Sequence, residues 1–533
     1  MQQLIKTVLC SLYLVFFVGH LMASDIIPAP LKTELLDGKY ELPSSPSYSF
    51  SNSCCKEAAM MAGYLKNQFG MYARSSKGPK TDIQLIITES KKIDSEAEGY
   101  ELKVTSTGIS IVAPSSAGIY YGIQSLLQIL SDKNGTVNRT IRCQHITDKP
   151  RFAWRAFMLD EARNFKGTPV VKKLLDQMAA LKMNTFHWHL TDDQGWRIEI
   201  KKYPLLTTIG SVRKVTQTGG IGSKTFDSTV HKGYYTKQEI KEIVQYAAAR
   251  HIKVVPEIEM PGHASAAIAA YPWLGVTGEK NEVAVTYGVF KDIYNVADPR
   301  VVGFFRDVLN EVAAMFPSNI IHIGGDEVIF DQWKSSPYVQ QFIEKNKVKS
   351  PADLQLWFTN SISSYLSKKQ LRMMGWNDIT GNQIHDYTDI RDTKLDRKLS
   401  PNTIVHFWKG DPVLVNQTVL DGYDVVNSYH EFTYLDYDYT SISLQKAYSF
   451  EPVPETLDPK LHHKVLGLGC QMWGEWITTH EKMYEQIFPR IAAYAEVGWT
   501  DKRNKNYNRF QAALPALEST WKKNGISGKN INF

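Results

Sequence analysis

Cysteine is scarce in this sequence: five occur in 533 residues, and one of them, Cys10, lies close to the N-terminus. So few cysteines exclude a disulfide framework of the kind that holds small secreted domains together. Cys54 and Cys55 are neighbours in sequence, and such neighbours seldom pair with each other. We therefore expect the later cysteines to be buried thiols. They are Cys54, Cys55, Cys143 and Cys470.

Long apolar runs are absent beyond the N-terminal segment, so no later stretch of about 20 residues is predicted to cross a bilayer. An excess of one charge is absent too, because 61 Lys and Arg stand against 55 Asp and Glu, a net charge of +6. No basic block could follow a phosphate backbone, which excludes nucleic acid as an expected partner. The composition is that of a soluble globular protein, long enough for two or three domains.

Residues 1–23 have the pattern of an export signal. Lys6 precedes an apolar run that starts at Val8, and Ala23 and Ser24 come just before an acidic residue. We expect cleavage near Ala23 and an exported mature protein, which would be periplasmic, secreted or lysosomal according to the host. The sequence defines neither the host nor the oligomeric state.

Residues 24–150 are predicted to form a small α+β domain. YELKVTSTGISIVAP, residues 100–114, alternates polar and apolar side chains as paired strands do. SSAGIYYGIQSLLQIL, residues 115–130, has the spacing of a helix, and an earlier helix is expected at 54–69. Pro150 then marks a change of character before a new apolar run.

Residues 151–533 alternate apolar strand candidates with segments of helical length. In one such segment, Thr236 and Glu239 have the spacing of a capping box. Eight strand-helix units predict a (β/α)8 TIM barrel, here with a C-terminal helix, rather than an open sheet. The strand candidates are AFMLDEARN (156–164), NTFHWHLTDD (184–193), KVVPEIEMPGH (253–263), NIIHIGGDE (319–327), RMMGWNDI (372–379), TIVHFW (403–408), DVVNSYH (424–430) and VLGLGCQMW (465–473).

The predicted strand ends collect acidic and aromatic side chains. A TIM barrel gathers its active site at the carboxyl ends of its strands, and packing alone gives no reason for acids and tryptophans to meet there. We therefore expect a ligand site at this rim. Its members are Asp160, Arg163, Asp192, Asp193, Glu257, His263, Asp326, Glu327, Trp376, Trp408, Tyr434, Asp436, Trp473 and Glu475.

The stretch IHIGGDEVIF, residues 321–330, places two carboxylates side by side. Successive side chains of a regular strand point to opposite faces, so Asp326 and Glu327 can serve one ligand only where the strand breaks. Gly324 and Gly325 would supply that break. The plainer interpretation is a strand followed by an acidic helix N-terminus.

One alternative for the rim is a metal-dependent hydrolase. His187 and His189 lie two apart on a strand and so face the same way, and His263 and Asp326 could complete a metal site with them. The milder interpretation is that inward-facing barrel histidines are satisfied by hydrogen bonds. This interpretation is favoured because the pair lies within the second strand and the other face of that strand is apolar.

A second alternative is an exported sugar-binding protein, in which the tryptophans would stack on the ligand and Arg163 would bind its hydroxyls. The third is a glycosidase, which needs a carboxylic acid to protonate the leaving oxygen. The Asp-Glu pair favours an enzyme, because binding alone requires no carboxylate placed for proton transfer. Adjacent acids cannot easily serve opposite faces of a sugar, which indicates a variant in which the substrate brings its own nucleophile.

Several motifs, in order, resemble the β-N-acetylhexosaminidases of glycoside hydrolase family 20. The segment before Pro150 also resembles the non-catalytic N-terminal domain of that family, so the resemblance covers nearly the whole exported chain. The motifs are LDEARNF (159–165), HWHLTDDQGWRIEIKKYP (187–204), VVPEIEMPGH (254–263), HIGGDEV (322–328), GWNDI (375–379), YLDY (434–437) and MWGEW (472–476).

The resemblance implies exo-acting, retaining hydrolysis of terminal β-linked GlcNAc or GalNAc from an oligosaccharide or glycan. The acetamido oxygen would attack the anomeric carbon and form an oxazolinium intermediate, an exception to the usual two-carboxylate scheme. Asp326 would orient the acetamido group, and Glu327 would be the acid and later the base. His263 would bridge Glu327 and an aspartate, for which the position in the motif favours Asp192 over Asp193. No cofactor or metal is implied.

The resemblance also implies substrate contacts for seven residues. Trp376, Trp408 and Trp473 would enclose the acetamido methyl group, and Tyr434 would donate a hydrogen bond to its carbonyl oxygen. The remaining three contacts would be to hydroxyl groups: Arg163 and Glu475 would hold the 3- and 4-hydroxyls, and Asp436 the 6-hydroxyl.

Two positions depart from the family pattern. Glu259 stands where the family more often has Asp, and the Asn-Asp pair at 377–378 replaces a commoner acidic pair. Neither position touches the chemistry that the resemblance implies, but both lie close to it in the sequence.

Overall fold

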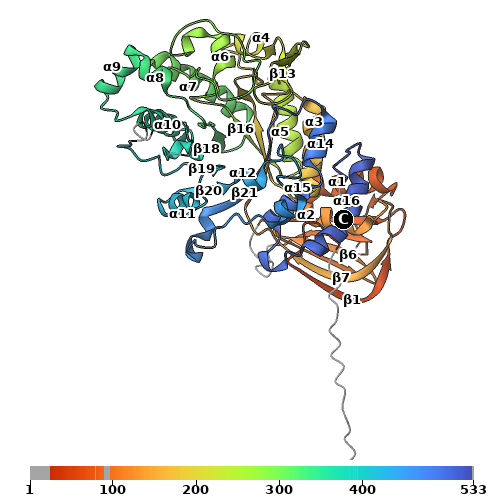
Figure 1. Cartoon of the computed structure of the whole chain (residues 1–533). Coiled ribbons are helices and arrows are strands. Elements are labelled where there is room, and N and C mark those ends of the chain that lie inside the picture. The colour runs from red at the N-terminus through yellow and green to blue at the C-terminus, as the bar shows by residue number, and fades with distance from the viewer. Residues whose placement is uncertain are drawn as a thin grey trace, which may run out of the picture.

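The computed structural model describes residues 25–530 except 79, 89–96, 383, 388, 390, 391 and 393. The export signal predicted at residues 1–23 lies outside this part. Among the described residues, no helix is both long enough and apolar enough to cross a membrane. Figure 1 shows a curved sheet with helices, coloured red to orange, packed against a larger body that contains a barrel.

The N-terminal domain is built on a seven-stranded sheet with the order β1-β7-β5-β6-β4-β2-β3. The predicted pair of alternating strands is β5 and β6, which pair antiparallel, and the two predicted helices are α1 and α2. The α+β prediction is confirmed. The elements are β1 (Lys32–Glu41), β2 (Ser47–Phe50), α1 (Cys55–Phe69), β3 (Arg74–Ser75), β4 (Ile83–Ile87), β5 (Tyr100–Thr105), β6 (Gly108–Ala113), α2 (Ser116–Leu130) and β7 (Thr140–Asp148).

Eight parallel strands then close into a barrel, and each one overlaps a segment predicted as a strand, although β8 begins two residues before its predicted segment. The prediction of a TIM barrel behind an α+β domain is therefore confirmed. The barrel strands are β8 (Trp154–Asp160), β9 (Thr185–His189), β16 (Lys253–Glu257), β17 (Ile320–His322), β18 (Arg372–Trp376), β19 (Ile404–Phe407), β20 (Asp424–Asn427) and β21 (Val465–Met472).

Helices cover the outside of the barrel, and α5 begins with the predicted capping box of Thr236 and Glu239. Ser519 of α16 donates a hydrogen bond of 2.9 Å to the Lys133 carbonyl oxygen, so the C-terminal helix packs against the N-terminal domain (Figure 1). The helices are α3 (Thr168–Ala180), α4 (Leu205–Thr208), α5 (Lys237–Ala248), α6 (Ser265–Ala270), α7 (Pro299–Met315), α8 (Asp331–Ser335), α9 (Pro337–Lys345), α10 (Pro351–Ser367), α11 (Val413–Leu420), α12 (His430–Thr433), α13 (Leu444–Ser449), α14 (His480–Ile487), α15 (Arg490–Trp499) and α16 (Tyr507–Lys523).

Short pairs of antiparallel strands lie in the segment between β9 and α5. The first of them, β10 with β11, places Asp192 opposite Gly195 in an antiparallel pair. The short strands are β10 (Thr191–Asp192), β11 (Gly195–Trp196), β12 (Val212–Arg213), β13 (Thr216–Thr218), β14 (Thr225–Asp227) and β15 (His231–Lys232).

The side chains inside the barrel are apolar near one end of its axis and include charged groups near the other. Near the amino ends of the strands it is filled by a separate apolar cluster that includes Trp154, Val255 and Met374. Towards the carboxyl ends the fully buried side chains include Glu257 and His322. Buried charged groups need partners, so this upper half must be organised by hydrogen bonds and ion pairs.

The two domains are joined by buried polar contacts. The Lys182 ammonium and the Asp148 carboxylate lie 2.9 Å apart, and both side chains are inaccessible to solvent. The Trp499 indole N–H donates to the other oxygen of Asp148 at 2.9 Å. Because both contacts are desolvated and directional, they fix the orientation of the sheet on the barrel.

The expectation of buried thiols is confirmed for Cys54, Cys143 and Cys470 and is wrong for Cys55, which is exposed. Cys55 is the first residue of α1, and its neighbours Cys54 and Ala58 turn towards the core in its place. Residue type alone did not indicate which face of this helix Cys55 would occupy.

Candidate active site

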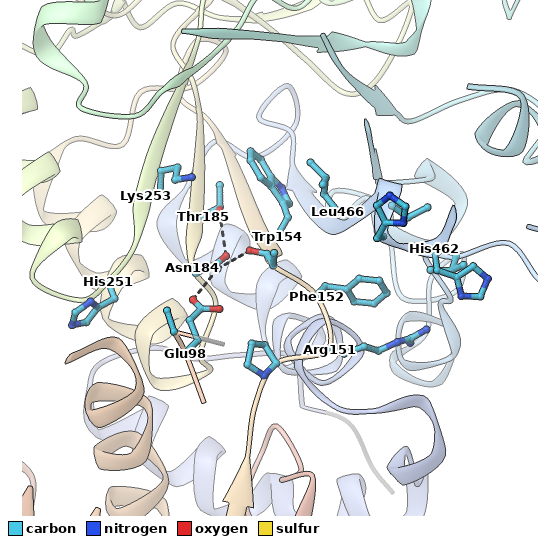
Figure 2. A pocket seen from close by; sticks show the side chains of 16 residues that line it. Glu98, Arg151, Phe152, Trp154, Asn184, Thr185, His251, Lys253, His462 and Leu466 are labelled. Carbon is cyan, nitrogen blue, oxygen red and sulfur yellow. Dashed lines mark hydrogen bonds between the residues drawn. The ribbon is translucent and has the colours of Figure 1, made fainter. Parts of the chain in front are cut away.

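A cavity of about 780 Å³ lies at the amino-terminal end of the barrel, far from the predicted rim (Figure 2). Its lining includes Trp154, Thr185 and Lys253, the first residues of β8, β9 and β16. The carboxylate in this cavity, Glu98, accepts a hydrogen bond of 3.0 Å from Asn184 and is paired with a buried arginine. The residues predicted to be functional all lie at the opposite end of the strands.

The chain breaks after β17, as the glycine pair predicts. Gly324 and Gly325 have φ values of 64° and 92°, and Glu327 itself has a φ of 53°. A Cβ atom on Gly324 would lie 1.7 Å from the Glu259 carboxylate, so no side chain fits there. The next helix, α8, begins only at Asp331, and the interpretation of these acids as a helix N-terminus is therefore wrong.

His263 stands between the two adjacent acids and a second pair of aspartates. Its Nε2 atom lies 3.6 Å from Asp326 Oδ2 and 3.8 Å from Glu327 Oε2. On the other side, Nδ1 makes a hydrogen bond of 2.9 Å with Asp193 and lies 3.2 Å from Asp192. The hydrogen bond thus goes to Asp193, whereas the motif had favoured Asp192. Both acids of the 326–327 pair face one imidazole.

Asp193 is the better hydrogen-bond partner because a second element fixes it. The backbone N–H of Ser265 donates to Asp193 Oδ1 at 3.0 Å, and the Ser265 hydroxyl donates to the same atom at 2.7 Å. Ser265 is the first residue of α6, which follows His263 directly. The loop that carries the histidine therefore also holds the carboxylate that orients it.

Asp192 forms an ion pair with Arg163. The guanidinium Nη2 lies 2.8 Å from Asp192 Oδ2 and 3.8 Å from Glu475 Oε1, while Nη1 lies 3.2 Å from Asp160. The guanidinium also lies over the Trp473 ring, 5.1 Å from its centroid. Arg163 is thus held in one orientation. Burial by itself would lower its pKa, but the surrounding carboxylates, Asp192 first, raise that pKa well above its ordinary value.

Four aromatic residues predicted to bind substrate form one continuous group, although they lie at or after the carboxyl ends of four different strands. The Trp376 and Trp473 ring centroids are 5.8 Å apart, and Trp473 lies 6.0 Å from Tyr434. Tyr434 in turn lies nearly parallel to Trp408, with centroids 6.1 Å apart and an interplanar angle of 7°. The structure thus brings these four rings together, and their role as a wall around the acetamido group stays a prediction.

Asp436 and Glu475 are half-buried acids beside this group. Burial, and then the charge of Glu475, raises the pKa of Asp436 well above its ordinary value. Among the described residues, the buried Oδ1 atom of Asp436 has no hydrogen-bond partner. Such an oxygen is available to a hydroxyl group of a ligand, and it would otherwise be costly to bury.

Opposing effects act on the pKa of Glu327. Burial raises it, the nearby His263 lowers it, and Asp326 raises it again. Burial also works to lower the pKa of His263, but Asp192 and Asp326 overcome this and raise that pKa well above 6.5. The arrangement therefore pairs a carboxyl group that retains its proton more readily than usual with an imidazole that stays protonated.

Sequence reasoning gave Asp378 no role, yet it contacts both the acid and the aromatic wall. Its Oδ1 accepts hydrogen bonds from the Glu327 backbone N–H at 3.1 Å and makes one of 2.7 Å with His385. Its Oδ2 accepts the Trp408 indole N–H at 2.9 Å. The departure noted at 377–378 was the available signal, but the partners of Asp378 come from other loops.

Four groups of His, Asp and Glu place potential metal-ligand atoms within 4.8 Å of one another in the described part of the chain. The metal-hydrolase alternative requires His187, His189, His263 and Asp326 to act together. The structure separates them, because His187 groups with Glu257 and His322, whereas His263 groups with Asp326 and Glu327. The proposed metal set is therefore not brought together.

Comparison with known proteins now decides the family. Residues 152–502 match the family model described as glycosyl hydrolase family 20, catalytic domain, and residues 23–149 match domain 2 of the same family. The chain belongs to glycosyl hydrolase family 20. It is therefore a glycoside hydrolase, and the resemblance predicted from its motifs is confirmed.

Relatives within family 20 are similar over most of this chain. A β-hexosaminidase of Porphyromonas gingivalis is 34% identical over 504 residues, which are 91% of this chain and 62% of the relative. A β-hexosaminidase of Vibrio furnissii is 33% identical, over 90% of this chain and 77% of the relative. The chain thus spans less than two thirds of the first relative and about three quarters of the second.

Solved structures of family 20 share the same architecture. An exo-β-N-acetylglucosaminidase of Vibrio harveyi, in complex with N-acetylglucosamine, superposes with a TM-score of 0.81 at 29% identity, covering 95% of this chain and 78% of the other. A β-N-acetylhexosaminidase of Bacteroides fragilis gives a TM-score of 0.79 at 30% identity, with 95% and 96% covered.

Proposed function

We propose that this family 20 glycoside hydrolase is a β-N-acetylhexosaminidase that removes terminal β-linked GlcNAc or GalNAc with retention of configuration. The nucleophile is the oxygen of the substrate's own 2-acetamido group. The observation that carries this proposal is the pair Asp326 and Glu327 on one side of His263, within 3.6 and 3.8 Å of its Nε2 atom. Two acids so placed suit two atoms on the same side of a sugar.

In the first step, Glu327 gives its proton to the glycosidic oxygen as the bond from that oxygen to the anomeric carbon breaks. The acetamido oxygen forms a new bond to the same carbon and closes an oxazolinium ring. The Asp326 carboxylate accepts the acetamido N–H and stabilises the positive charge that develops on the ring nitrogen. Burial raises the pKa of Glu327, and so it favours the protonated acid that this step requires.

In the second step, the Glu327 carboxylate takes a proton from water as the water oxygen attacks the anomeric carbon. The bond from that carbon to the acetamido oxygen breaks, which restores the acetamido group. Each step inverts the anomeric carbon once, so the released sugar keeps the β configuration. The acid of the first step is the base of the second.

The aromatic residues around the acid pair recognise the acetamido group of the sugar. Trp376, Trp408 and Trp473 enclose the acetamido methyl group, and Tyr434 donates a hydrogen bond to its carbonyl oxygen. Holding that oxygen at bonding distance is equivalent to a high local concentration of nucleophile. The similar Vibrio harveyi structure is a complex with N-acetylglucosamine, which supports an N-acetylhexosamine as the ligand of this family 20 fold.

The hydroxyl groups at the non-reducing end are held by Arg163, Glu475 and Asp436. Arg163 has donors beside Glu475, and Asp436 offers an oxygen to which no described residue donates a hydrogen bond. Bonds to the 3-, 4- and 6-hydroxyls leave no room for a further sugar on that side. Exo action follows from this closure.

A panel of nitrophenyl β-glycosides, assayed with and without chelator, tests the proposal. We expect turnover of the N-acetylglucosaminide or N-acetylgalactosaminide at the same rate in EDTA. Loss of activity in EDTA would favour the metal-hydrolase interpretation, and no turnover of any β-N-acetylhexosaminide would favour a binding protein. Proton NMR of the first product should show the β anomer, and an α anomer appearing first would reject retention.

A further inference from the structure

Glu257 is the last residue of β16 and is completely buried at the barrel axis. Its Oε1 accepts a hydrogen bond of 2.8 Å from the Trp376 indole N–H, and its Oε2 makes one of 2.7 Å with His189. Nitrogen atoms of His187 and His322 lie 2.9 and 2.8 Å from the same carboxylate. One acid thus contacts side chains from β9, β17 and β18.

The first contact fixes the orientation of a wall residue. An indole ring has a single polar atom, Nε1, and in Trp376 that atom is bonded to Glu257. The Trp376 ring also stacks on His406, with centroids 4.2 Å apart, and lies near His322 and Trp473, at 4.9 and 5.8 Å. The hydrogen bond therefore selects which way the indole is rotated among these ring neighbours.

The second contact, between Glu257 and His189, connects Glu257 to the residues around Asp192. His189 lies between two carboxylates, 2.7 Å from Glu257 and 2.9 Å from Asp192. Both of its ring nitrogens face oxygen acceptors, which requires the protonated imidazole. Asp192 then lies 2.8 Å from Arg163 and 3.2 Å from His263. Glu257 is thus three contacts away from the arginine and from the histidine beside the acid pair, with His189 and Asp192 in between.

We propose that Glu257 is a positioning residue of the reaction, which holds Trp376 in the acetamido wall and, through His189, holds Asp192 with its two partners. The inference rests on the proposed function, since it concerns how the acetamido group and the sugar hydroxyls are held. Glu257 touches neither substrate nor reacting atoms. It sets the geometry of two otherwise separate parts of the site.

The substitution Glu257→Gln keeps the size of the side chain but removes one acceptor, because an amide –NH2 cannot accept from Trp376 or His189. We expect kcat/KM for nitrophenyl N-acetyl-β-glucosaminide to fall on the order of 100-fold, as misplaced reacting groups do. Affinity for a thiazoline mimic of the oxazolinium ring should fall on the order of 10-fold or more.

Glu496→Gln is the matched control. Glu496 is equally buried, accepts a hydrogen bond of 3.0 Å from the Ala29 backbone, and lies on α15, away from the rim. This variant should melt earlier yet keep its kcat/KM and thiazoline affinity within about twofold. If Glu257→Gln behaves in the same way, with an earlier melt and unchanged kinetics, the inference is overturned.

Trp376→Phe provides a test that does not depend on the folding of Glu257→Gln. It keeps an aromatic ring in the wall and removes the indole N–H, and it should weaken thiazoline binding on the order of 10-fold. In that background, Glu257→Gln should cause a smaller fold-loss than in the wild type, because the shared contact is already gone. Unchanged affinity in Trp376→Phe, or fully multiplicative losses in the double variant, would overturn the inference. A wild type that cleaves no N-acetylhexosaminide would reject the proposed function itself.

Discussion

The Nε2 atom of His263 lies 3.8 Å from the Oε2 atom of Glu327. A protonated imidazole at this distance favours the carboxylate form of the acid, whereas burial favours the neutral form. The working pKa of Glu327 is therefore a balance between two opposing effects, and each can be altered separately.

His263→Ala should move the alkaline limb of the kcat/KM profile to higher pH. Removing the positive charge leaves burial and Asp326 to act on Glu327, and both raise its pKa, so the acid keeps its proton to a higher pH. The rate at the optimum should fall on the order of 10- to 100-fold, because the acid loses its neighbour. His463→Ala, in the cavity at the other end of the barrel, is the control and should leave the profile in place. An alkaline limb that does not move in His263→Ala, or that moves to lower pH, would contradict the claim that His263 lowers the pKa of Glu327.

Glu327→Gln should discriminate between leaving groups. A natural disaccharide leaves as a poor alkoxide and needs the proton, so its kcat/KM should fall on the order of 100-fold or more. A nitrophenolate leaves well without help, and its kcat/KM, which reports the first step, should fall much less. Pre-steady-state release of nitrophenol isolates that step. Equal losses for the two substrates would remove general-acid catalysis from Glu327.

Trp473→Ala should weaken both thiazoline binding and turnover. Trp473 contacts Trp376, Tyr434 and Arg163, so its loss opens the wall and frees the acetamido oxygen to move away from the anomeric carbon. Trp521→Ala in α16 is a buried-tryptophan control that should lower the melting temperature only. If both variants melt earlier and both retain normal kinetics, Trp473 is simply part of the core.

Glu259→Gln should stabilise the protein more at neutral than at acidic pH. Glu259 is 1% exposed, and both of its carboxylate oxygens lack a hydrogen-bond partner among the described residues. Burial, followed by Asp326 and Glu257, raises its pKa well above 4.5. Above pH 4.5 the unfolded chain releases a proton that the folded chain retains, so this carboxyl lowers the stability of the wild type as pH rises.

The amide of the Glu259→Gln variant has no proton to release. The free energy of unfolding of the variant therefore lacks this contribution to its pH dependence. The melting temperature of the variant minus that of the wild type should be larger at pH 7.5 than at pH 4.5, on the order of 2 °C or more. Differential scanning calorimetry at the two pH values measures it. A difference that shrinks as pH rises would mean that Glu259 is ionised in the folded protein.

Much of the fold could be predicted because its signals are local. The eight barrel strands are short apolar runs, the capping box of α5 spans four residues, and Gly324 and Gly325 mark the break after β17. The residues of the rim could be predicted because the carboxyl ends of parallel strands all lie at the same end of a barrel. These inferences needed no knowledge of distant contacts.

Contacts between distant segments could not be predicted. Asp193 rather than Asp192 makes the hydrogen bond to His263 because Ser265, 72 residues further along, anchors it. Glu257 was placed at the rim without a role, since its partners lie on three other strands. Periodicity reports which side chains point inward, but not which of them will meet.

The central claim is that the substrate's acetamido group is the nucleophile, and a matched pair of substrates tests it most directly. The measurement is kcat/KM for nitrophenyl N-acetyl-β-glucosaminide against that for nitrophenyl β-glucoside, which differs only by a hydroxyl in place of the acetamido group. The account predicts hydrolysis of the first and at most marginal hydrolysis of the second, because the glucoside has no oxygen that can close the five-membered ring. Comparable kcat/KM values for the two substrates would contradict the account, because the enzyme would then have to supply the nucleophile itself.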